Sequence, residues 1–226
     1  MSLPEPYYHD EKYGLTIYHG DCREILPELP KVDLVLTDPP YGIDYDPKMY
    51  SKWDGSDNEW DKIVNDLEMI DYHFLFSLDS RTKVVFGAEN ILSFVPHRGR
   101  WICWDKKLYE KNDSSIGSPF EIAWVDVNTG FYKMYRVLHN GVVNADSVRG
   151  NNQKRFHPTQ KPVKLFRSII QDFSKDGTIL DPFMGSGTTL VAAKQLGRKA
   201  IGIEIEEKYC EIAVKRLRQD VLEFAG

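Results

Sequence analysis

The chain has 226 residues, of which 42% are hydrophobic, so it has enough apolar side chains for one folded domain and too many for a disordered chain. The net charge is −5, which taken alone argues against a nucleic-acid-binding protein. No run approaches 18 consecutive apolar residues, and Cys22, Cys103 and Cys210 are too scattered for a disulfide framework or a CxxC zinc site, so we expect a cytoplasmic protein without a membrane span or a bound metal.

Short apolar runs alternate with segments of helical periodicity, which favours an α/β protein with a largely parallel sheet. One helix is expected to begin at Pro162, a favoured first-turn residue, and another to end at Gly197. In chain order, the predicted elements are strands 15–18 and 34–37, helix 60–76, strands 83–86, 101–104 and 121–125, helix 162–173, strand 178–180, helix 188–196, strand 200–203 and helix 206–219.

Two long polar segments lack this periodicity. They are residues 42–59 and residues 126–156, and the second contains at most one strand, near 135–138. Loops of this length in a compact domain are usually functional or disordered. Both segments are therefore candidates for functional regions outside the core.

The predicted strand 34–37 runs into the tetrapeptide Asp38-Pro39-Pro40-Tyr41. The two prolines fix the backbone and remove two N–H donors, which leaves the Asp38 carboxylate and the Pro39 carbonyl as acceptors in a rigid geometry. Tyr41 adds a flat ring beside them. Such a site suits an exocyclic amine on a planar base, and the alternative is an ordinary turn with a packed tyrosine.

Residues 178–204 form a strand–turn–helix–strand unit whose turn is Gly185-Ser186-Gly187. Glycines let a ligand approach the backbone, and a helix N-terminus favours an anionic group. Glu204 follows the turn by 17–19 residues, where its carboxylate can accept hydrogen bonds from two ribose hydroxyls. The spacing is not GxGxxG, and no lysine follows Gly187 as in a triphosphate-binding loop, so the unit predicts a nucleoside-type cofactor.

These motifs resemble those of the amino-group DNA methyltransferases that use S-adenosylmethionine (AdoMet). DPPY at 38–41 is similar to their catalytic motif, and DPFMGSGTT at 181–189 to their cofactor motif. The other similar segments are GDC at 20–22, HPTQKP at 157–162 and GIEIEEKY at 202–209. The resemblance spans about residues 14–215, and the catalytic motif precedes the cofactor motif, which is the order of the β group.

The resemblance implies a role for each matching residue. Asp38 and Pro39 hold the target amine, Pro40 completes the motif, and Tyr41 stacks on the flipped base. Glu204 holds the ribose, Asp21 binds the adenine of the cofactor, and Asp181 and the glycine turn hold its methionine end. The full set implied for AdoMet is Asp21, Cys22, His157, Thr159, Gln160, Lys161, Asp181, Phe183, Gly185, Ser186, Gly187, Thr188 and Glu204.

The charges are distributed unevenly, which changes the interpretation of the net charge. Residues 1–79 carry 18 acidic and 6 basic residues, whereas residues 80–226 carry 16 acidic and 23 basic residues. Within the second part, residues 149–167 hold six Lys or Arg and no acid. Arg149, Lys154 and Arg155 of this basic stripe are candidates for contacts with DNA phosphates, and the alternative is a solvated surface.

The resemblance also implies the fold and the reaction. It implies a Rossmann-like single domain over 1–226, with a seven-stranded, mostly parallel sheet that contains one antiparallel strand. The reaction is direct in-line transfer of a methyl group from AdoMet to a flipped-out base in double-stranded DNA. TDPPY in this order favours adenine N6; cytosine N4, RNA, protein glutamine and a non-catalytic binding module remain alternatives.

Two features depart from bulkier members of the family. Residues 126–156 correspond to a minimal target-recognition region, and no nuclease motif is present, as in stand-alone methyltransferases of phage and prophage. Residues 42–59 are expected to form a mobile loop in which Tyr50 and Trp53 can contact nucleotides. The sequence leaves the recognition site and the choice between monomer and homodimer open.

Overall fold

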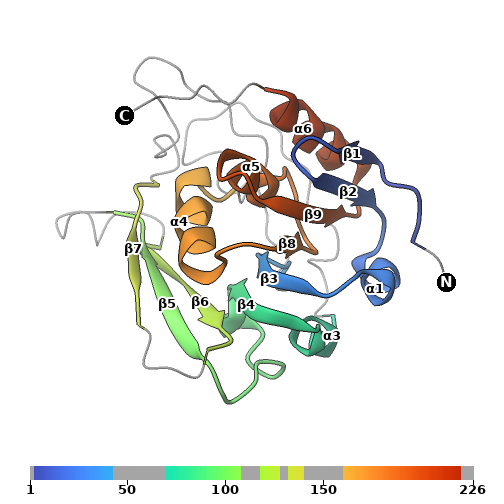
Figure 1. The fold of residues 1–226 in the computed structure, drawn as a ribbon. Helices are drawn as coiled ribbons and strands as arrows, with labels where there is room; N and C mark the ends of the chain where they lie inside the picture. Colours follow the sequence, from blue (N-terminus) through green and yellow to red (C-terminus); the bar gives the residue numbers. More distant parts are fainter. Residues whose placement is uncertain (1–2, 43–69, 108–117, 128–131, 140–159, 220–226) are drawn as a thin grey trace.

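The computed structural model describes residues 3–42, 70–107, 118–127, 132–139 and 160–219. They form one nine-stranded sheet with helices on both faces (Figure 1). The strands lie side by side in the order β1-β2-β9-β8-β3-β4-β6-β5-β7. Their bounds are β1 Tyr8–Asp10, β2 Leu15–His19, β3 Val32–Thr37, β4 Ser80–Phe86, β5 Arg100–Asp105, β6 Phe120–Val125, β7 Met134–Arg136, β8 Thr178–Asp181 and β9 Lys199–Glu204.

Seven of these strands form the sheet that the sequence predicts. β2, β9, β8, β3 and β4 pair in parallel, and β6 runs antiparallel to both β4 and β5. Two three-residue strands extend this sheet at its edges: β1 pairs antiparallel with β2, and β7 pairs in parallel with β5. Strand β1 was not predicted from the sequence, whereas β7 overlaps the strand expected near 135–138.

Strand β3 shows why the sheet is buried on both faces. Leu34 and Leu36 contribute to the hydrophobic core on one face, and Val35 contributes to the core on the other. Successive side chains of a strand point to opposite faces, so a continuous apolar run such as VDLVLT needs cover on both sides. Parallel sheets with helices on both faces satisfy this requirement.

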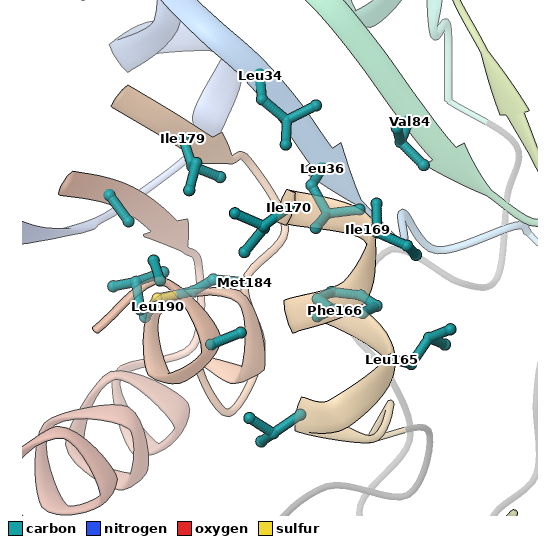
Figure 2. Close-up of a cluster of buried hydrophobic side chains, with 14 of the residues drawn as sticks. Leu34, Leu36, Val84, Leu165, Phe166, Ile169, Ile170, Ile179, Met184 and Leu190 are labelled. Atoms are coloured by element: carbon teal, nitrogen blue, oxygen red, sulfur yellow. The ribbon is translucent and has the colours of Figure 1, made fainter. Parts of the chain in front are cut away.

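The helices divide between the two cores. Helices α4 Val163–Phe173, α5 Thr188–Gln195 and α6 Glu207–Arg218 pack on the face of Leu34 and Leu36. Figure 2 shows Phe166, Ile169 and Ile170 of α4 among side chains of the strands. Helices α1 Cys22–Ile25 and α3 His73–Ser77 cover the other face, and two short 3-10 helices span Leu26–Glu28 and Ala88–Asn90.

Three of the four predicted helices are confirmed. α4 begins one residue later than predicted because Pro162 has an extended backbone and precedes the helix as its N-cap. The left-handed Gly197 follows α5, as expected. Helix 60–76 falls mostly on residues that the structure does not describe, and its last part coincides with α3. Among the described helices, none is long and apolar enough to cross a membrane.

The order of the parallel strands changes direction between β3 and β8. The chain passes from β3 to β4 on one side and from β8 to β9 on the other. In an open α/β sheet, ligands bind outside the carboxyl ends of the strands at such a switch point. The tetrapeptide at 38–41 follows β3 and the glycine turn follows β8, so the fold brings both motifs to this position.

Candidate active site

The carboxylate of Asp38 stands at the carboxyl end of β3 with 17% of its side chain exposed. Its Oδ1 accepts a hydrogen bond from the Tyr41 hydroxyl, and its Oδ2 accepts one from Nζ of Lys161. Burial and the neighbouring Asp38 raise the pKa of Tyr41 well above its usual value, so the hydroxyl remains a donor. Both carboxylate oxygens are thus bound by N–H or O–H donors of the chain itself, the type of group that an exocyclic amine would present.

The aromatic ring of Tyr41 lies directly against the backbone of Gly87. A Cβ atom built on Gly87 would overlap the ring, and Gly87 has a left-handed φ of 61°. A glycine is therefore required here both by the backbone conformation and by the close approach of the ring. A second contact holds the DPPY segment: the hydroxyl of the buried Tyr72 donates a hydrogen bond to the carbonyl of Pro40.

Asp181, the last residue of β8, holds the start of the glycine turn. Its Oδ1 accepts hydrogen bonds from Oγ1 of Thr37 at 2.8 Å and from the backbone N–H of Phe183 at 3.2 Å. Its Oδ2 accepts the hydroxyl of Thr189 in α5. Burial raises the pKa of Asp181 to about 6, although these three donors oppose the rise. The carboxylate therefore joins β3, β8 and α5 beneath the turn.

Glu204 ends β9 beside the same turn. Its Oε2 accepts the N–H of Gly185 at 2.9 Å, and its Oε1 accepts the N–H of Glu206 at 2.8 Å. Burial raises the pKa of Glu204 to about 7. The carbonyl of Glu204 also accepts the N–H of Gly20 at 2.9 Å, which brings the GDC segment alongside. The structure thus brings together two segments of the predicted cofactor site that are far apart in the sequence.

Arg216 of α6 holds Ser186 of the turn and Thr188, the first residue of α5. Nη1 of Arg216 donates to the carbonyl of Ser186 at 2.7 Å, to its Oγ at 3.0 Å and to Oγ1 of Thr188 at 3.2 Å. Gly187 has a φ of 79°, and a Cβ atom there would lie 2.7 Å from Cβ of Ala213 in α6. Ser186 and Thr188 are buried, so Arg216 and the missing Cβ together fix the shape of the turn.

The GDC segment carries one acidic and one thiol side chain. Asp21 caps α1 by accepting the N–H of Arg23 at 2.9 Å, and hydrogen bonds from Arg23 lower the pKa of Asp21. Burial raises the pKa of the Cys22 thiol to about 12, so this cysteine is a packing residue and not a reactive thiolate. The half-buried ring of Phe183 packs against Tyr72, with 6.3 Å between the ring centroids.

Gln160 and Lys161 connect the two motifs. Oγ of Ser186 lies 3.4 Å from Oε1 of Gln160, whereas Lys161 reaches away from the glycine turn to Asp38 and to Oε2 of Glu121, at 3.3 Å from the latter. Lys161 was expected at the cofactor, and the structure brings its ammonium to the catalytic motif. Sequence spacing gave no signal for this contact, because the two residues are 123 positions apart.

Several predicted residues lie outside the described part of the chain. They are His157, Thr159, Arg149, Lys154, Arg155 and residues 43–59 of the expected loop, together with 128–131 and 140–156 of the expected recognition segment. Within the described ranges, no group of three or more His, Cys, Asp or Glu side chains could hold a metal ion. The candidate site therefore rests on the DPPY motif, the glycine turn, the GDC segment and Gln160-Lys161.

The residues around the turn fit AdoMet. Two carboxylates, of Asp21 and Glu204, offer acceptors for amino and hydroxyl groups, and the Gly20–Glu204 hydrogen bond holds their segments together. Phe183 adds an apolar surface for a flat base. The turn offers backbone groups and no lysine, which suits a nucleoside better than a triphosphate.

Comparison with known proteins defines the class. A family profile described as DNA methylase, for N6 and N4 methyltransferases, matches residues 32–215, and the chain therefore belongs to this family of AdoMet-dependent DNA methyltransferases. It is 30% identical to the type II methyltransferase M2.DpnII of Streptococcus pneumoniae, over 96% of this chain and 94% of that protein. It is also 30% identical to M.HinfI of Haemophilus influenzae, over 90% of this chain and 68% of that protein.

Solved structures agree with this assignment. The M1.HpyAVI–SAM complex is 26% identical, covers 91% of this chain and 100% of the solved chain, and has a TM-score of 0.55. The cytosine-N4-specific PvuII DNA methyltransferase has a TM-score of 0.61 over 96% of this chain and 90% of its own, with 16% identity, which shows a shared fold. The fold and the cofactor expected from the sequence are thereby confirmed.

Proposed function

We propose that the chain is a site-specific DNA methyltransferase that methylates the N6 amine of adenine in double-stranded DNA. The observation that carries this proposal is the position of Asp38, at the switch point of the sheet and next to the glycine turn. The order of the motifs, with TDPPY before the cofactor motif, favours adenine N6 over cytosine N4. Both amines suit the same acceptors, so cytosine N4 is the alternative that the experiment must separate.

Asp38 and Pro39 act on the amine. An amine conjugated to a purine ring is a poor nucleophile because its lone pair is delocalised. Hydrogen bonds from the amine to the Asp38 carboxylate and the Pro39 carbonyl favour tetrahedral nitrogen and localise the lone pair. The positive charge that develops on the nitrogen is then stabilised by the Asp38 carboxylate, which is fixed in place before the reaction.

The proposed reaction requires Tyr41 to adopt two positions. In the structure its hydroxyl donates a hydrogen bond to Oδ1 of Asp38. Before the target amine can donate to this oxygen, the hydroxyl must move away, and the ring then stacks on the incoming base. Extrusion of a base costs a few kcal/mol, and stacking on an aromatic ring returns about 1–3 kcal/mol of it.

We propose that three residues around the glycine turn bind the nucleoside part of AdoMet. Glu204 accepts the ribose hydroxyls, Asp21 the adenine amine, and Phe183 contacts the adenine ring. When bound, AdoMet supplies a methyl group activated by a sulfonium, which the amine nitrogen accepts directly. Arg149, Lys154 and Arg155 are proposed to contact DNA phosphates.

The test is a methylation assay with isotope-labelled AdoMet and unmethylated genomic DNA, RNA and protein in separate reactions. Digestion of the DNA to nucleosides and mass spectrometry then identify the product. We expect N6-methyldeoxyadenosine from the native chain and far less in the same reaction time from Asp38→Ala. N4-methyldeoxycytidine, or label in RNA or protein alone, would contradict the proposal.

A further inference from the structure

A chain of alternating charges extends from Asp38 into the protein. Nζ of Lys161 binds Oδ2 of Asp38 and lies 3.3 Å from Oε2 of Glu121, and Oε1 of Glu121 is paired with Lys106. The Lys161 side chain is only 9% exposed, and its ammonium also lies 5.6 Å from the centroid of the Phe86 ring. The contacts of this cation are therefore made inside the protein.

The direction of β6 explains why Glu121 reaches the site. β6 is antiparallel to β4, so its amino end lies at the same edge of the sheet as the carboxyl ends of the parallel strands (Figure 1). Glu121 is the second residue of β6. The opposite end of the strand, followed by Asp126, lies about 17 Å away at about 3.3 Å per residue.

Glu121 is a charged group under ordinary conditions. Burial raises its pKa, but Lys161 and Lys106 outweigh this effect and lower the pKa to about 2. Burial also opposes the charge on Lys161, and Asp38 and Glu121 nevertheless raise its pKa. The other titratable groups facing this cluster are Tyr41, which donates to Asp38, and Glu89, whose pKa is raised by burial and by the neighbouring carboxylates.

We propose that Glu121 is a positioning residue for methyl transfer, acting on Asp38 through Lys161; this inference rests on the proposed function. Glu121 holds the ammonium of Lys161 on Oδ2 of Asp38, so that Oδ1 alone is exchanged between the Tyr41 hydroxyl and the target amine. It also balances the charge of Lys161. Asp38, Lys161, Glu121 and Lys106 together carry no net charge, whereas without the charge of Glu121 the other three carry one positive charge, which would oppose the developing cation.

The test compares Glu121→Gln with Asp126→Asn. Asp126 is a matched control because it also lies between two cations, 3.7 Å from Nζ of Lys83 and 3.6 Å from Nε of Arg98, with 16% of its side chain exposed. In single turnover at saturating AdoMet and DNA, we expect Glu121→Gln to lower the rate by about tenfold or more. AdoMet affinity should change less than about twofold, and Asp126→Asn should keep the native rate.

A second variant separates charge balance from simple structural support. Glu121→Gln combined with Lys161→Met restores the native net charge of the cluster, so this double variant should be faster than Glu121→Gln alone. A double variant that is no faster than the single one, with both folded, would overturn the inference. A native rate in Glu121→Gln, together with a strongly reduced rate in Asp38→Ala, would also overturn the inference but would leave the proposed function intact. If the native chain transferred no methyl group to DNA, both the proposed function and the role of Glu121 would be contradicted.

Discussion

Oγ1 of Thr37, at the end of β3, donates a 2.8 Å hydrogen bond to Oδ1 of Asp181, at the end of β8. The two residues are 144 positions apart in the sequence, and each directly precedes or begins one of the two motifs of the site. Their contact lies where the strand order reverses, and both side chains are buried. The catalytic motif and the glycine turn are thus joined by a hydrogen bond to a carboxylate.

Replacing Thr37 by valine should loosen this junction. The change keeps the shape and removes the donor, so we expect a loss of about 1–3 kcal/mol in the free energy of unfolding. The loss should grow as the pH rises through about 6, where Asp181 ionises, because the hydroxyl favours the ionised form. Denaturant titrations at pH 5 and pH 8 measure it. Thr37→Ser keeps the donor and is the control; equal losses in both variants would show that packing alone matters.

Glu204 should make AdoMet binding depend on pH. Its pKa of about 7 means that it is largely neutral in slightly acidic solution, and a carboxylate is the better acceptor for ribose hydroxyls. We therefore expect AdoMet affinity, measured by calorimetry, to rise from pH 5.5 to pH 8. In Glu204→Gln the affinity should be lower at pH 8 and nearly independent of pH.

The raised pKa of Glu204 should make the protein less stable, in the absence of AdoMet, as the pH rises. Its pKa is raised on folding, so its contribution to stability is complete below about 4.5 and is lost as the pH rises through about 7. Without AdoMet, Glu204→Gln should equal the native chain in stability near pH 4.5 and exceed it at pH 8, by about 1–3 kcal/mol. A constant difference over this range would contradict the burial of this carboxylate.

Gly87 and Gly197 provide a matched pair for testing the position of Tyr41. Both have left-handed backbones, with φ of 61° and 64°, so alanine at either costs about 1–2 kcal/mol of stability. A Cβ atom on Gly87 overlaps the Tyr41 ring, whereas one on Gly197 meets nothing within 4 Å. We expect Gly87→Ala to reduce methyl transfer strongly and Gly197→Ala to leave it nearly unchanged. Equal activities, compared at equal folded fractions, would contradict the role of this contact.

The basic stripe predicts a salt effect. If Arg149, Lys154 and Arg155 each contact one phosphate, replacing all three by alanine should flatten the slope of log K against log salt concentration by about 2.7. AdoMet affinity should remain nearly native. Alanine at Lys31 and Lys215, exposed cations outside the stripe, is the control. An unchanged DNA affinity in the triple variant would make the stripe a solvated surface.

Much of the fold follows from local sequence patterns. Each of the seven central strands has an apolar run, and α4, α5 and α6 have apolar faces long enough to be recognised. The elements that the patterns missed are short: β1 has three residues and α1 has four. Such elements are set by the neighbours they pack against and carry little periodicity of their own.

The residues of the candidate site also fall into two groups, those that the sequence predicts and those that it does not. Asp38, Gly185 and Glu204 were recognisable because their motifs are continuous in the sequence. Arg216 and Glu121 were not, since their roles depend on side-chain contacts across the sheet and between helices. The contact between Lys161 and Asp38 joins the segment that precedes α4 to the residue that follows β3. Only the three-dimensional structure brings these residues together.

The most direct test of the central claim is the single-turnover rate of Asp38→Ala with saturating AdoMet and DNA. The variant should fold, because Lys161 keeps its contact with Glu121, and it should bind AdoMet with near-native affinity. Loss of the carboxylate facing the developing cation predicts a rate lower by about 10²–10³, or roughly 3–4 kcal/mol. A folded Asp38→Ala protein that binds AdoMet and methylates DNA at a near-native rate would contradict the account.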